Sequence, residues 1–171
     1  FLLNADLFIN VPKLKIMRET CISCAMKNIF GCIASPKKIV YHPVLNEAIV
    51  GVNKILHPHL TIVDGLVTLG RSPFKLGMIM ASIDPFSIDW VASQIMSYNP
   101  RKIKFLKMAT EEKIGNPNNI ITCGETLVAF RTVFPKANFF QSRRLMGIRL
   151  GLLRLYSKIV GDIIPPVLEE S

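Results

Sequence analysis

Short apolar runs without polar alternation constrain the fold of this chain more than any other feature. They lie at residues 7–11, 60–63, 76–81 and 120–123. Strands buried on both faces have this pattern, whereas strands with one face in water alternate. Segments with helical spacing separate the runs, at residues 24–33, 45–56, 85–99 and 101–113. The order predicts an α/β fold, with a mostly parallel sheet covered on both faces by flanking helices.

The composition agrees with a well-filled core. Half of the 171 residues are apolar and 19% are charged, which excludes a disordered chain because such chains have the opposite balance. No apolar run approaches the roughly 18 residues of a membrane span. Because the chain begins at Phe1, directly before a strand-like run, we expect an N-terminal portion to be missing.

The positive charge is concentrated near the C-terminus. The net charge is +9, and seven bases without any acid lie between Glu125 and Asp162. The remaining residues carry 14 bases against 12 acids and are nearly neutral. We therefore predict an α/β domain over residues 1–130 and a basic helical extension over residues 131–171.

Residues 143–160 of this extension have the pattern of an amphipathic helix. Four bases share the side opposite a wide apolar arc: Arg143, Arg144, Arg154 and Lys158. Such a face docks on its own domain, on a protein partner or second copy, or on an anionic membrane surface. The nearby aromatic side chains occupy apolar positions and form no stacking platform, which argues against nucleic acid.

Several ordered motifs resemble the domain-of-unknown-function family number 362, over about residues 6–125. They are Asp6 to Val11 followed by Pro12-Lys13-Leu14-Lys15, then Lys27-Asn28-Ile29-Phe30-Gly31, Val63-Asp64-Gly65, and Ala81-Ser82-Ile83-Asp84-Pro85 with Asp89. Where the family usually has threonine and histidine after the first motif, this chain has Ile16 and Met17. The chain also has a shorter segment after Gly65. The resemblance implies an intracellular protein often associated with iron–sulfur modules, and it implies no particular reaction.

Charged side chains follow three of the predicted strands. Lys13 and Lys15 follow the first strand, in the polar and basic residues 13–20 that we expect to form a loop. Asp64 follows the second strand, and Asp84 and Asp89 follow the third. Ligands of open α/β sheets bind outside the carboxyl ends of parallel strands, so we expect these side chains to meet at one rim. The lysines would hold an anionic or phosphorylated ligand, and the aspartates would bind a divalent metal or transfer a proton.

Two further residues, Lys27 and Asn28, are expected beside this ligand site, and the three aspartates are the candidate catalytic groups. Structural roles compete with this interpretation. Asp84 has the position of a helix N-cap before Pro85, and Asp64 precedes Gly65 as in a turn. The sequence leaves open whether the domain is an enzyme.

The cysteines have the spacing C-x2-C-x7-C, with Cys21, Cys24 and Cys32. Three thiolates suit an iron–sulfur cluster or zinc, and each needs a fourth ligand from elsewhere, such as Cys123 or His42. The first two could instead form a redox pair, or all three could be inert core residues. Reduced thiols favour a cytoplasmic location.

Two functions therefore remain open. The first is an enzyme-like or cofactor-binding domain that holds an anionic ligand or metal cofactor at the strand ends. The second is a non-catalytic interaction module that acts through its basic C-terminal helix. Walker, GxGxxG, HExxH and GxSxG motifs are absent from the sequence, so it gives no local support for the chemistries that depend on them.

Overall fold

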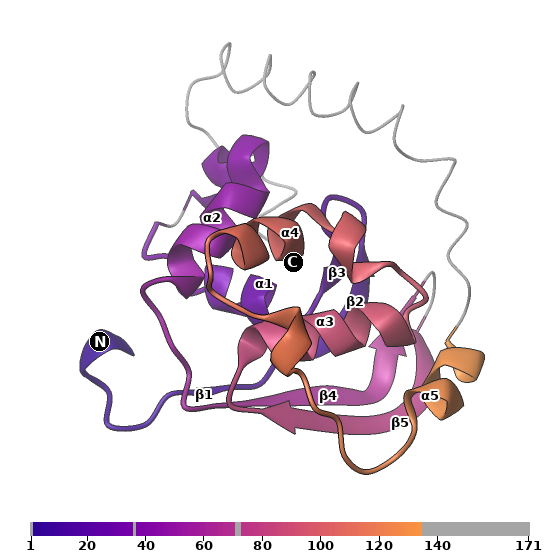
Figure 1. Ribbon diagram of the computed structural model, residues 1–171. Coiled ribbons are helices and arrows are strands. Elements are labelled where there is room, and N and C mark those ends of the chain that lie inside the picture. The colour runs from indigo at the N-terminus through magenta and orange to yellow at the C-terminus, as the bar shows by residue number, and fades with distance from the viewer. Residues whose placement is uncertain (1, 36, 71–72, 135–171) are drawn as a thin grey trace. The chain divides into compact units, whose positions relative to one another are not determined.

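The computed structural model describes residues 2–35, 37–70 and 73–134, which belong to one compact unit of residues 1–136 (Figure 1). Most of the predicted basic extension, including residues 143–160, lies outside the described residues. None of the helices in the described residues combines the length and the hydropathy of a membrane span.

A mixed sheet is built around the long strand β4 (Leu60–Leu69). Strands β1 (Ile9–Asn10) and β2 (Lys13–Met17) follow one another along one side of β4 and run parallel to it. Strand β5 (Pro73–Ser82) pairs antiparallel with the other side of β4, and β3 (Cys21–Ser23) pairs antiparallel with β2.

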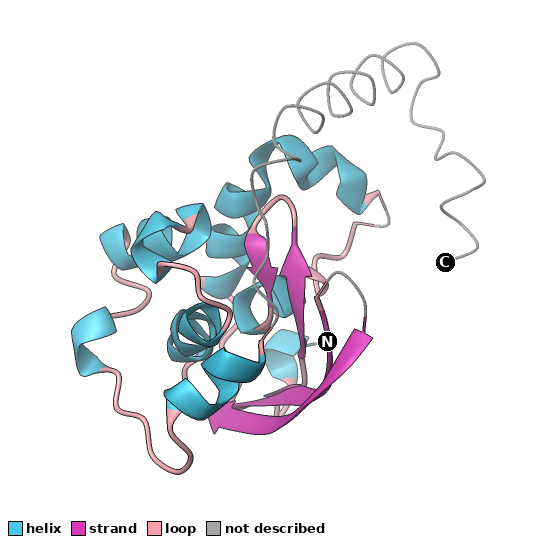
Figure 2. Ribbon diagram, turned by 90° about the vertical axis from the view of Figure 1, so that its right-hand side faces the viewer, coloured by secondary structure: helices cyan, strands magenta, loops and turns pink. Residues whose placement is uncertain are grey.

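Five α-helices accompany this sheet in the described residues. They are α1 (Ala25–Phe30), α2 (Leu45–Asn53), α3 (Pro85–Ile95), α4 (Lys104–Glu111) and α5 (Leu127–Val133). Four 3-10 turns lie at η1 (Leu2–Asn4), η2 (Lys38–Val44), η3 (Pro100–Lys102) and η4 (Pro117–Asn119). Helices α1 to α4 gather over one face of the β1–β4–β5 region (Figure 1), and Figure 2 shows the same separation from the side.

The predicted α/β class with a mostly parallel sheet and flanking helices is confirmed, in that three of the five strands, β1, β2 and β4, run in one direction. The expectation that helices cover both faces is wrong for the described part of the chain. Burial alternates along β5, where Leu76 and Met78 are buried while Ile79 is exposed. The outward face also carries the exposed side chains of Ile9 and Val11.

Three local predictions are also wrong. Residues 13–20, expected as a loop, contain β2, because Lys13, Leu14 and Lys15 alternate exposed, buried and partly buried along a strand. Asp64-Gly65, expected as a turn, lies inside β4 at an irregularity of the β4–β5 register. Residues 120–123, expected as a strand, have no strand assignment.

A buried carboxylate joins helices α3 and α1. Asp89 of α3 is 0% exposed; its Oδ1 accepts from the Ala25 N–H at 2.7 Å and its Oδ2 from the Met26 N–H at 3.0 Å. These are the first N–H groups of α1, whose N-cap residue Cys24 gives no side-chain cap. Asp89 therefore caps α1 from a neighbouring helix. Burial raises its pKa to about 7, although the two backbone N–H groups oppose that shift.

A tight contact between Gly115 and Phe86 sets the distance from the segment after α4 to the start of α3. A Cβ at Gly115 would lie 2.0 Å from Cγ of Phe86, whose side chain is 1% exposed. Since the buried ring has little room to move, only glycine fits here.

We expect the pH dependence of stability to change in Asp89→Asn. Because folding raises the pKa of Asp89 to about 7, the folded state holds its proton more tightly, and this group makes stability fall as pH rises from about 4 to about 7. Between pH 5 and pH 7.5, the free energy of unfolding measured with urea should fall by about 2 kcal/mol more in the wild type than in Asp89→Asn. Asp6→Asn, at an exposed position, is the control and should behave as wild type. Equal falls in wild type and Asp89→Asn would contradict this assignment.

A second prediction concerns Gly115→Ala. The added methyl group overlaps the Phe86 ring, so urea unfolding should show a loss of about 3 kcal/mol. Gly51→Ala is the matched control, because a Cβ there meets nothing within 4 Å and Gly51 lies inside α2. That control should be as stable as wild type or more stable by about 0.5–1 kcal/mol. A Gly115→Ala variant as stable as the control would show that the contact is not rigid.

Candidate functional site

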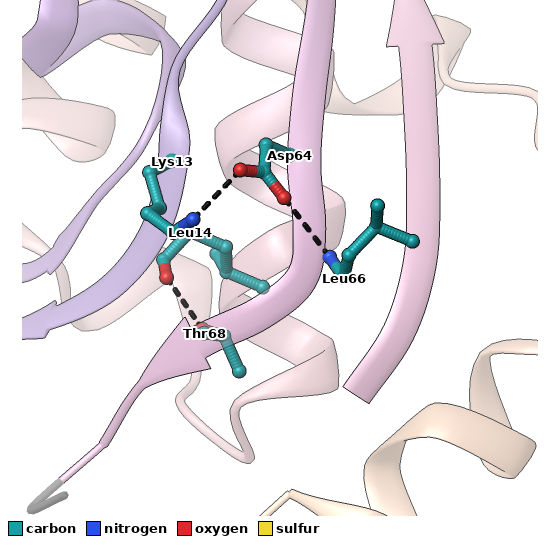
Figure 3. Close-up of polar contacts among 5 residues, drawn as sticks. All are labelled: Lys13, Leu14, Asp64, Leu66 and Thr68. Carbon is teal, nitrogen blue, oxygen red and sulfur yellow. Dashed lines mark hydrogen bonds and ion pairs between the residues drawn. The ribbon is translucent and has the colours of Figure 1, made fainter. Parts of the chain in front are cut away.

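Lys13 and Asp64, two of the predicted strand-end residues, meet on the outward face of the sheet. They occupy paired positions on β2 and β4, and the Lys13 Nζ lies 2.7 Å from the Asp64 Oδ2 (Figure 3). The Asp64 Oδ1 accepts from the Leu66 N–H at 3.1 Å. The hydrogen bond from Lys13 and then the one from Leu66 lower the pKa of Asp64. Both side chains remain about half exposed, so this is a surface ion pair within the sheet.

Asp84 lies away from this pair, so the expectation that all these residues share one rim is wrong. Strand β5 runs antiparallel to β4, and its last residue, Ser82, pairs with Thr61 near the amino end of β4. From this pair, the chain continues past Ser82 to Asp84 in one direction. Asp64 lies three residues beyond Thr61 in the opposite direction, which is about 10 Å along β4. The direction of β5 therefore separates the two carboxylates.

Asp84 caps helix α3, as its position before Pro85 indicates. Its Oδ1 accepts from the Phe86 N–H and its Oδ2 from the Ser87 N–H, each at 3.0 Å, and the Ser87 hydroxyl also donates to Oδ2. Asp89, one turn further along α3, is fully buried beneath α1. The three predicted catalytic aspartates thus lie in three different environments.

The remaining predicted ligand residues are Lys15 in β2 and Lys27 and Asn28 in α1. Burial lowers the pKa of Lys27 most, and the neighbouring ammonium of Lys15 lowers it further. Asn28 donates to the Asn10 Oδ1 at 2.8 Å, and Asn10 in turn donates to the Ala25 carbonyl at 3.1 Å. Asn28 therefore helps to join α1 to β1.

The cysteines are not grouped as metal ligands in the described residues. Cys21 lies in β3, Cys24 precedes α1 and Cys32 follows it, and no three His, Cys, Asp or Glu side chains in this part of the chain gather around one point. Burial and the nearby Asp89 raise the pKa of the Cys24 thiol well above its usual value. Metal binding needs the thiolate, and burial beside Asp89 disfavours the thiolate form of Cys24. Metal binding by Cys21, Cys24 and Cys32 stays a prediction.

A polar pocket lies where β5 enters α3, and most of its residues were not identified from the sequence. Its volume is about 810 Å³, and Ser82, Asp84 and Ser87 form one wall. The opposite wall comes from the end of α4 and from η4. Its polar side chains are those of Thr110, Lys113, Asn116 and Asn119. Of the predicted site residues, only Asp84 lines this pocket.

Local sequence explains the shape of the second wall. The Asn116 Oδ1 accepts from the Asn118 N–H at 3.0 Å, which starts η4 with Pro117 in its first turn. Lys113 has a φ of 59°, and Gly115 packs against Phe86. The Gly-Asn-Pro-Asn-Asn run after a basic helix is a recognisable loop signal. Loops of this kind often carry binding residues, so the sequence did contain a signal for this wall.

The pocket offers more hydrogen-bond donors than its single carboxylate requires. Asp84 already accepts from three donors of α3. The Ser82 Oγ accepts from the Asp84 N–H at 3.0 Å, which leaves the Ser82 hydroxyl able to donate. Together with the ammonium of Lys113 and the amides of Asn116 and Asn119, this arrangement suits an anion.

Comparison with known proteins gives one named relative. A protein of Synechocystis sp. named as thylakoid-associated is 31% identical over 129 residues, which cover 67% of this chain and 40% of that protein. The chain thus spans less than half the length of that relative. No solved structure matches this chain.

A family model matches residues 1–94, more than half of the chain. The matched residues include the pocket wall formed by Ser82, Asp84 and Ser87, and they end before Lys113 and Asn116. The description of that model is "Domain of unknown function (DUF362)". The chain belongs to the DUF362 family.

Proposed function

We propose that this chain is a ligand-binding domain that takes an anionic small molecule in the pocket between α3 and η4. The observation that carries the proposal is that Lys113, Asn116, Asn119 and Ser82 all line one cavity of about 810 Å³. This volume falls within the range of about 300–1,000 Å³ that is usual for small-molecule sites. The proposal assigns binding and leaves the reaction, if there is one, unassigned.

Electrostatics favour an anion despite the carboxylate in the wall. Asp84 lies at the N-terminus of α3, where the helix dipole and the Phe86 and Ser87 N–H groups compensate its charge. Lys113 projects from the end of α4 with its side chain exposed, and it is the lysine among the lining residues. An anionic group placed beside Lys113 would therefore meet donors rather than an uncompensated negative charge.

Titration with inorganic phosphate tests this proposal. In amide-resolved NMR spectra of the full chain, we expect phosphate to shift the signals of Gly115, Asn116 and Asn119. Lys113→Ala should weaken binding roughly fivefold to tenfold, because it removes a charge-assisted hydrogen bond. Lys107→Ala is the matched control, since Lys107 lies on α4 in an exposed pair with Glu111.

Two outcomes would contradict the proposal. One is a set of phosphate-induced shifts spread evenly over all lysine-bearing surfaces. The other is equal weakening by Lys113→Ala and Lys107→Ala, since both would show general attraction of the anion to a basic protein.

As a second function, we propose that the basic C-terminal segment attaches the protein to an anionic membrane surface. The support is the amphipathic pattern of residues 143–160 in the sequence, together with the relative that is named as thylakoid-associated. A protein partner or a second copy of this chain is the competing occupant of the same segment.

Vesicle co-sedimentation distinguishes these occupants. We expect the chain to bind vesicles of phosphatidylcholine with phosphatidylglycerol, and not pure phosphatidylcholine vesicles. Replacing Arg143, Arg144, Arg154 and Lys158 by Gln should weaken binding roughly a hundredfold or more, since each base contributes on the order of 1 kcal/mol near an anionic surface.

The matched control replaces four exposed bases of the α/β domain by Gln, namely Lys75, Arg101, Lys102 and Lys107. It should retain binding. No binding to anionic vesicles, combined with self-association that the C-terminal replacement abolishes, would support the second copy instead.

We also propose a cytoplasmic location. The support comes from the sequence, because a chain of 171 residues with a well-filled core does not need disulfides for stability.

A further inference from the structure

An apolar cavity adjoins the polar pocket. It has a volume of about 380 Å³ and lies between β5, α3, the segment before α5, and α5 itself. Its apolar lining includes the side chains of Met78, Met80, Val91, Ile95, Leu127 and Phe130.

The apolar cavity and the polar pocket share part of their walls. Ser82, Ser87, Ile120 and Ile121 line both of them. A molecule that extends past these residues would therefore have one end beside Lys113 and the other among apolar side chains. The combined space is polar at one end and apolar at the other.

Large apolar side chains are exposed along this space. Ile121 is 93% exposed and lines both cavities, and Leu127 and Phe130 are partly exposed in the lining of the apolar one. An apolar ligand would remove part of this surface from water, which favours its binding.

The charges at the two ends fix the direction in which an anion would lie. Lys113 is in the polar pocket, whereas Glu125 lines the apolar cavity. A negatively charged head is attracted to the first end and repelled from the second. Its apolar chain would then extend along β5 toward α5.

We propose that the ligand is a single-chain anionic amphiphile, with a phosphate head beside Lys113 and Asn116 and an alkyl chain between β5 and α3. This inference rests on the proposed function, because it places the anion in the same polar pocket. It adds the apolar chain, which the polar pocket alone does not require.

The test compares the affinity of the full chain for dodecyl phosphate, used below its critical micelle concentration, with its affinity for inorganic phosphate. Dodecyl phosphate should bind at least about tenfold more tightly, because its alkyl chain leaves water. Nuclear Overhauser contacts from the alkyl protons should reach the methyl groups of Met78 and Met80. The Met26 methyl group, buried in the core outside both cavities, is the internal control and should show none.

Substitutions distinguish the contribution of the phosphate head to binding from that of the alkyl chain. Ile121→Ser should weaken the binding of dodecyl phosphate roughly threefold to tenfold more than it weakens the binding of inorganic phosphate. Ile55→Ser is the matched control, because Ile55 is 63% exposed and lines neither cavity. Lys113→Ala should weaken the binding of both probes.

Two results would overturn the inference in distinguishable ways. Equal affinities for the two probes, with phosphate still bound at Asn116 and Asn119, would reject the alkyl chain and leave the anion site standing. Dodecyl phosphate that contacts Met80 but is insensitive to Lys113→Ala, with no binding of inorganic phosphate, would reject the anionic head and the proposed function with it.

Discussion

The buried carboxylate of Asp89 is the interaction on which the arrangement of the described helices depends. It caps the first N–H groups of α1 from within α3, so neither helix can shift without leaving polar groups unpaired in the core. Asp84 and Ser87, which form one wall of the polar pocket, lie in the same helix start. The internal cap therefore also fixes the position of that wall, although Asp89 itself does not reach the ligand space.

The direction of β5 decides where the candidate site forms. Because β5 returns antiparallel to β4, the chain enters α3 beside the amino end of β4, away from the Lys13–Asp64 pair. The N-terminus of α3 then faces the segment after α4, where Gly115 packs against Phe86. Lys13 consequently remains on the outward face of the sheet, and a different lysine, Lys113, lines the pocket.

Sequence reasoning could reach the α/β class, the main helices and the cap at Asp84, because each depends on local spacing. It missed β2 because the lysines of Lys13-Leu14-Lys15 suggested a loop, although their alternation with leucine is the period of a half-buried strand. It also took β5 as parallel, although a parallel crossover needs a dozen or more residues, usually with a helix. Only residues 70–72 separate β4 from β5. The contact between Gly115 and Phe86 joins distant segments, so no local pattern could reveal it.

The two sides of the ligand space have different origins in the sequence. Residues matched by the family model provide β5 and the start of α3, and thus Ser82 and Ser87. The positive charge of Lys113 and the exposed side chain of Ile121 come from the segment after residue 94. The scaffold can therefore stay the same while a few side chains in that later segment determine the charge and apolar surface offered to a ligand. In the proposed site, residues 110–125 therefore contribute more to ligand chemistry than the strand ends do.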